Sequence, residues 1–90
     1  MKPLKPIRLG VLKEFAQAKM IRELVAEKQH SKLGYHLIIR LRTEDRVLST
    51  NRSIAPRLFK TLEAVAIEAN KLKITEFSVV GIGPQPRSLR

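Results

Sequence analysis

Few residues in this chain could perform chemistry. It has no cysteine and only two histidines, His30 and His36, and neither has an Asp or Glu at a spacing typical of a metal site. The adjacent carboxylates Glu44 and Asp45 lie in a polar stretch typical of a turn, where such side chains form local hydrogen bonds. The segment Gly81-Ile82-Gly83 lacks the third glycine and the following helix of a phosphate-binding loop. Since no Ser or Thr has a partnered base either, we expect a protein that is not an enzyme and uses neither a metal ion nor a cofactor.

Positive charge is the dominant feature of the composition. Eighteen Lys and Arg face eight Asp and Glu, which gives a formal net charge of +10 on 90 residues. Residues 1–60 hold fourteen of the basic residues and five of the acidic ones, whereas residues 61–90 are nearly balanced. A small basic domain typically binds a polyanion, because each cation that reaches a phosphate releases a condensed counterion.

Two groups of cations are candidates for contact with DNA. One lies on a predicted pair of antiparallel strands and the connector after it, where Arg40 and Arg42 share a face that Arg46 or Arg52 joins, depending on the register. The other lies near the N-terminus, where a basic arm can follow a groove. The expected nucleic-acid-binding residues are Arg40, Arg42, Arg46, Arg52, Arg57, Lys60, Lys2, Lys5 and Arg8.

The alternative interpretation is that these cations form an ordinary solvated surface, because strand edges often carry Lys and Arg that discourage aggregation. Aromatic side chains that would stack on single-stranded bases are nearly absent, at one Tyr and three Phe. The composition therefore favours duplex DNA over single strands.

The hydrophobic pattern of the first half predicts a short helix followed by paired strands. Apolar residues recur at helical spacing from Val11 to about Lys19. Residues 21–29 are compatible with a helix or a strand, and the turn-like segment 31–34 favours a strand. Strict alternation over residues 35–42 predicts a strand, and residues 46–50 return antiparallel to it after a polar turn. The expected unit is a three-stranded antiparallel meander.

The second half predicts an amphipathic helix and a final strand. Leu62, Val65, Ala69 and Leu72 belong to one apolar stripe, and Thr61 is the preferred N-cap, which leaves residues 56–59 as an extended connector. Residues 76–80 form the last strand. The fold class is therefore α+β, with a helix face covering the sheet.

The length allows a single small domain over residues 11–80, between a flexible basic arm (residues 1–10) and a flexible C-terminal tail (residues 81–90). The first residues are basic but lack the apolar run of a signal peptide, and no apolar stretch has the length of a membrane span. We expect a cytoplasmic protein with no membrane partner.

Short motifs in the middle of the chain resemble a known family. They comprise Leu12-Lys13-Glu14-Phe15, Ile21-Arg22-Glu23, Gly34-Tyr35, the run from Arg57 to Glu63, and Ile74 with Glu76-Phe77-Ser78-Val79. Over roughly residues 11–80 the chain resembles the plasmid partition-associated ParC family, which is distinct from the topoisomerase subunit of that name. The resemblance implies helix, three strands, helix, strand, and a role in plasmid or mobile-element stability. The chain departs from the family pattern by lacking a helix-ending glycine near Lys73 and a long C-terminal extension.

Two functions follow as expectations. The first is a DNA-binding accessory protein, acting as a homodimer, that assists plasmid or mobile-element partition or maintenance. The alternative is a protein-interaction module, antitoxin-like or a partition adaptor, whose exposed strand edge docks an acidic partition or toxin protein.

Overall fold

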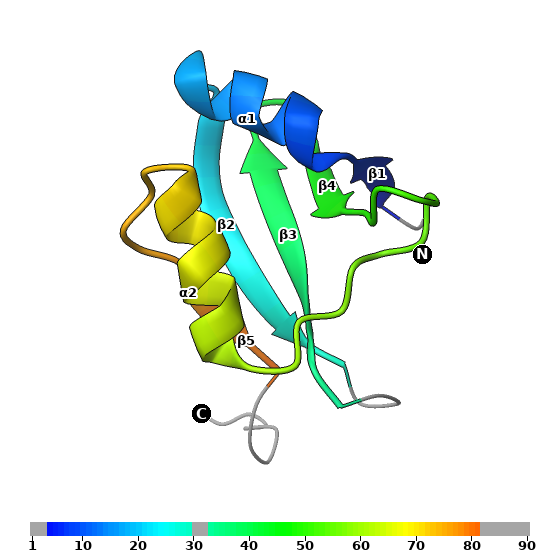
Figure 1. Cartoon of the computed structure of the whole chain (residues 1–90). Coiled ribbons are helices and arrows are strands. Elements are labelled where there is room, and N and C mark those ends of the chain that lie inside the picture. The colour runs from blue at the N-terminus through cyan, green and yellow to red at the C-terminus, as the bar shows by residue number, and fades with distance from the viewer. Residues whose placement is uncertain (1–3, 30–32, 82–90) are drawn as a thin grey trace.

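Alternating hydrophobicity in the middle of the chain produces the central sheet. The computed structural model describes residues 4–29 and 33–81, and its elements are drawn in Figure 1. Strands β2 (Ile21–Lys28), β3 (Tyr35–Leu41) and β4 (Asp45–Leu48) pair antiparallel in sequence order. The antiparallel meander and the strand over 21–29 are confirmed.

Two further strands extend this meander, and both pair parallel to their neighbours. Strand β1 (Lys5–Ile7) lies beside β4 and strand β5 (Ser78–Val80) lies beside β2, so the order is β1-β4-β3-β2-β5. The described residues thus form an α+β domain with a five-stranded mixed sheet, which confirms the fold class and extends the simple meander.

The N-terminal segment differs from the flexible arm expected for residues 1–10. Residues 5–7 form β1, and helix α1 runs over Leu9–Gln17, so Gly10 lies inside the first helical turn instead of ending an arm. The prolines and lysines of this segment are typical of a loop, so the sequence did not predict a strand here. The strand is held by one buried apolar residue, Ile7, which is only 2% exposed and pairs with Leu48. Pro6 is tolerated because β1 is an edge strand. Residues 1–3, and with them Lys2, lie outside the described residues, as does the expected tail beyond Gly81.

Both helices lie on one face of the sheet, with α1 across one end and α2 (Leu62–Lys71) along β2 (Figure 1). The main core forms between this face and the helices. Its buried residues are Ile7, Leu12, Leu24, Ala26, Leu37, Ile39, Leu41, Leu48, Phe59, Val65, Ala69 and Leu72. The opposite face carries a small apolar row of Val25, Ile38 and Val47, one from each central strand. Neither helix of the described residues is long and apolar enough to cross a membrane.

Thr61 begins α2 as the sequence predicts. Its side-chain oxygen accepts a hydrogen bond from the Ala64 backbone N–H at 3.0 Å, which satisfies one donor of the first turn. The connector before it bridges to β3, because Tyr35 and Phe59 exchange two backbone hydrogen bonds of 2.7 and 2.8 Å. Gly34 makes this close approach possible, since a Cβ at its position would lie 2.5 Å from the Phe59 carbonyl oxygen.

A buried carboxylate links the connector to α2. Glu68 is 4% exposed, and its Oε1 accepts a hydrogen bond from the Arg57 guanidinium at 3.4 Å, while Oε2 has no partner among the described residues. The same guanidinium lies 4.6 Å from the centre of the Phe59 ring. Arg57 therefore compensates a buried charge in addition to packing on an aromatic face.

Removing this guanidinium should destabilise the fold. We expect Arg57→Ala to lower the free energy of unfolding by about 2 kcal/mol, because Glu68 is left buried without a partner. Arg52→Ala, also between β4 and α2 but at an exposed position, should change it by less than about 0.5 kcal/mol. Urea unfolding of both variants measures the difference, and equal stabilities would show that the pair does not support the connector.

Candidate functional site

The register between β3 and β4 separates the arginines that the sequence placed on one ribbon. Arg40 pairs with Asp45, whereas Arg46 pairs with Ile39, whose side chain is in the main core. Arg46 therefore projects toward the helix side and Arg40 toward the opposite face. Across that face Arg40 has Glu23 in register on β2 and Asp45 on β4. The row is alternately acidic and basic, so it does not form a cationic ribbon.

Three of the predicted arginines lie beside carboxylates. Arg40 Nη1 is 3.9 Å from Glu23 Oε1, and Arg57 is paired with Glu68. Arg46 donates from both Nε and Nη2 to Glu44 Oε2, at 2.9 and 2.7 Å. A nearby carboxylate offsets the positive charge of each of these arginines. They are therefore poorer candidates for contact with phosphates.

The pair of Arg46 and Glu44 lowers the pKa of the Glu44 carboxyl below its ordinary value. The hydrogen bond from Arg46 is the largest cause and outweighs desolvation, which acts in the opposite direction, while the positive charges of Arg46 and Lys5 lower the pKa further. The carboxylate consequently stays ionised to a lower pH than a free glutamate would.

The remaining predicted cations have no carboxylate within ion-pairing distance among the described residues, but they are dispersed. Lys5 lies on β1, Arg8 precedes α1, Arg52 lies between β4 and residue 56, and Lys60 precedes α2. Arg42 follows β3 and lines a hollow whose other charged residues are of both signs, namely Arg22, Glu23, Arg40, Glu44, Asp45 and Glu76. The structure does not bring the members of the predicted set that it describes, which exclude Lys2, onto one surface.

A different group of cations does come together. A cleft of about 650 Å³ opens where α1 and α2 end, and we call it the helix-end cleft. Its basic residues are Lys13, Lys19, Lys71 and Lys73, and no described carboxylate lines it. The remaining lining is apolar apart from Gln17, and consists of Ala16, Ile21, Leu72 and Ile74. It combines four exposed ammonium groups with an apolar floor.

Both helices end in the same way at this cleft. After α1, the N–H of Lys19 donates to the Ala16 carbonyl and that of Met20 to the Phe15 carbonyl, at 3.1 and 2.9 Å. After α2, Lys73 donates to Asn70 and Ile74 to Ala69, at 2.9 and 3.0 Å. Each pattern is a Schellman motif, which satisfies carbonyls that a helix end otherwise leaves unpaired.

The residue that turns the chain in each motif is a lysine in the left-handed conformation, with φ of 58° at Lys19 and 63° at Lys73. Glycine normally occupies this position, because the left-handed region costs other L-residues about 1–2 kcal/mol. Both side chains are exposed, so packing does not offset that cost. Fold stability alone therefore favours glycine at both positions, where the chain instead carries cations.

Sequence reasoning missed these four lysines. Lys71 and Lys73 lie in the nearly balanced last third of the chain, and Lys13 and Lys19 fall on an apparently ordinary helix. One signal was available, since the missing helix-ending glycine is replaced by a lysine. A lysine at the position where a helix normally ends on glycine was therefore the sequence signal that indicated this site.

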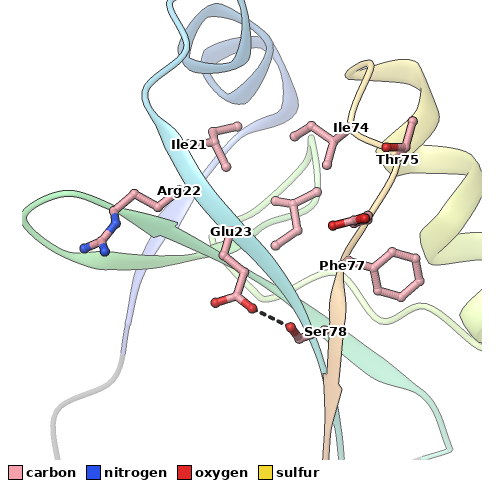
Figure 2. A pocket seen from close by; sticks show the side chains of 9 residues that line it. Ile21, Arg22, Glu23, Ile74, Thr75, Phe77 and Ser78 are labelled. Atoms are coloured by element: carbon pink, nitrogen blue, oxygen red, sulfur yellow. Dashed lines mark hydrogen bonds between the residues drawn. The ribbon is translucent and has the colours of Figure 1, made fainter.

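The helix-end cleft continues into a second groove at Ile21 and Ile74, which line both. Figure 2 shows this groove between the start of β2 and the chain that leads into β5. The Ser78 hydroxyl donates to the Glu23 carboxylate across it, and Glu76 also lines it. These carboxylates make the second groove unfavourable for an anion, so the cationic site ends at the two isoleucines.

No family model, curated protein or solved structure matches this chain. Within residues 4–29 and 33–81, no group of three or more His, Cys, Asp or Glu side chains could hold a metal ion. The helix-end cleft is consequently the candidate site, on the strength of its geometry and charge.

The free-energy cost of the left-handed backbone conformation at Lys19 and Lys73 can be tested by substitution with glycine. We expect Lys19→Gly and Lys73→Gly each to raise the free energy of unfolding by about 0.5–1 kcal/mol, because glycine adopts this conformation without strain. Lys13→Gly, the same change inside α1, should lower it by about 1 kcal/mol. Urea unfolding measures all three, and destabilisation by the first two would contradict the strain at the helix ends.

A second prediction concerns the pH dependence of Glu44. Its lowered pKa means that the pair with Arg46 contributes stability above the ordinary pKa of a glutamate, and that this contribution is lost as the pH falls through the lowered value. Arg46→Gln should return the pKa toward its ordinary value, whereas Arg40→Gln should leave it unchanged. An NMR pH titration of the Glu44 carboxyl carbon measures both, and an unshifted titration in Arg46→Gln would exclude the pairing.

Proposed function

We propose that this protein binds the phosphate backbone of duplex DNA through the helix-end cleft and has no enzymatic activity. The observation that carries the proposal is the convergence of four lysines from two helix ends, with no described carboxylate in the lining. Lysine ammonium groups attract phosphates as point charges and release condensed counterions when they bind. The resemblance to the partition-associated family supplies the proposed cellular role, which is plasmid or mobile-element maintenance.

The chemistry of the cleft favours contact with the backbone over recognition of bases. Bases are read mainly by Arg, Asn and Gln in bidentate geometry, and Gln17 is the single residue of these types among the described lining residues. The protein should therefore bind duplexes of different sequence with similar affinity.

Single strands are a poorer fit than a duplex. Stacking on unpaired bases requires accessible aromatic rings. Phe59 is buried, and Phe15, Tyr35 and Phe77 are partly buried against the main core. All four aromatic residues of the chain thus pack in or against the main core, which leaves none placed to stack on bases.

The test compares two variants that each lose four positive charges. The cleft variant changes Lys13, Lys19, Lys71 and Lys73 to Gln. The matched variant changes Lys5, Arg8, Arg52 and Lys60 to Gln, which removes the dispersed and unpaired cations that the sequence analysis favoured. Binding to a fluorescent 20-base-pair duplex is followed by anisotropy at 50–200 mM salt, and urea unfolding shows that both variants fold.

The wild-type protein should show a slope of log affinity against log salt of about −3 to −4 if four phosphates are contacted. The cleft variant should bind on the order of 100-fold more weakly at 100 mM salt with a slope near zero, while the matched variant should lose less than tenfold. If the matched variant loses binding and the cleft variant keeps it, the dispersed cations form the DNA site instead. If the wild-type protein does not bind duplex at 50 mM salt, the proposed function is wrong, and binding of an acidic protein partner becomes the better explanation of the basic surface.

A further inference from the structure

The two edges of the sheet differ in their capacity to accept another strand. Strand β1 at one edge contains Lys5 and Pro6, and both residues are exposed. Proline lacks a backbone donor and lysine opposes edge-to-edge contact, so these residues protect that edge. Strand β5 at the other edge has the sequence Ser78-Val79-Val80, with neither a proline nor a charged residue.

The outer edge of β5 is unpaired in the part of the chain that the structure describes. Its registered partners are Val25, Ala26 and Glu27 of β2, and no backbone hydrogen bond joins Ser78–Val80 to another described segment. Val79 is packed against the main core, which holds the strand in place, whereas Val80 is 43% exposed. The edge is therefore held in strand geometry, and its outward backbone donors and acceptors have no partner among residues 4–29 and 33–81.

We propose that β5 pairs antiparallel with β5 of a second copy of this chain, with the two-fold axis at Val79. In this register Val79 lies opposite Val79, and Ser78 of each copy lies opposite Val80 of the other. Antiparallel pairing around a central residue is self-complementary, as a two-fold interface requires. The two β-branched valines suit a cross-strand pair, and no like charges are brought opposite one another.

Local charge explains why a second copy can approach at this edge. Two molecules with a net charge of +10 repel each other over most of their surfaces. Three of the eight carboxylates lie near β5, since Glu27 is in register with Val80, Glu23 accepts a hydrogen bond from Ser78, and Glu76 lies two residues before the strand. These carboxylates offset part of the net positive charge beside the unprotected edge.

A two-fold axis perpendicular to the sheet would make one continuous sheet of the two copies. Both helix layers would then lie on the same face, so the two helix-end clefts would also share that face. The proposed dimer does not rest on DNA binding, because it follows from the strand edge alone. A pairing of three residues is smaller than a standard interface, so we expect a dissociation constant on the order of 10–1000 µM.

The experiment uses the full chain without DNA, at 500 mM NaCl to screen the net charge. Sedimentation equilibrium from 10 µM to 1 mM should show a concentration-dependent dimer. Val80→Lys should raise the dissociation constant at least tenfold, because it places a charge on the paired edge of each copy. Val11→Lys is the matched control, since Val11 is 41% exposed on α1 and Val80 is 43% exposed, and it should dimerise like the wild type.

The register of the β5–β5 pairing can be tested by disulfide cross-linking, because the chain has no cysteine of its own that would interfere. Val79→Cys should oxidise to a covalent dimer across the two-fold axis, whereas Val11→Cys should not. A wild-type protein that stays monomeric at 1 mM, or a Val80→Lys variant that dimerises like the wild type, would overturn the proposal. Dimerisation without the Val79 cross-link would place the axis elsewhere and reject this register.

Discussion

The way in which the two helices end determines the charged surface of this protein. Each helix stops in a Schellman motif whose turning residue adopts the left-handed conformation, and both helices pack on the same face of the sheet. These two constraints bring both helix ends to a single cleft. Because the turning residues are Lys19 and Lys73, the geometry that terminates the helices also directs two cations to that cleft.

The positive charges of this chain divide into two physical groups. Arg40, Arg46 and Arg57 lie beside carboxylates, and Arg57 in particular compensates the buried Glu68. Their charge is used largely within the fold. The lysines of the helix-end cleft have no such partner in its lining, and two of them occupy positions that glycine would fill at lower free energy. A net charge alone cannot distinguish these groups, since it counts both equally.

Local patterns in the sequence predicted most of the elements. Alternation over residues 35–42 predicted the strand that the structure gives as Tyr35–Leu41, and Thr61 is the N-cap of α2 as predicted. Both signals act over a few residues. β1 was missed because it is a short edge strand with a single buried anchor, Ile7, between residues typical of a loop. The faces of Arg40 and Arg46 depend on the strand register, where a shift of one residue reverses the outcome.

The lysine in place of a helix-ending glycine was the one local signal of the cleft. The cleft as a whole could not be predicted from local patterns, because its residues are far apart in the chain and meet only once both helices are packed. NMR chemical-shift mapping tests its role most directly. On titration of labelled protein with a short duplex at low salt, the account predicts that the largest shifts occur at the lysines of the cleft (residues 13, 19, 71 and 73) and at their neighbours Ile21 and Ile74. Shifts concentrated instead at residues 5–8, 52 and 60, with the cleft unaffected, would contradict it.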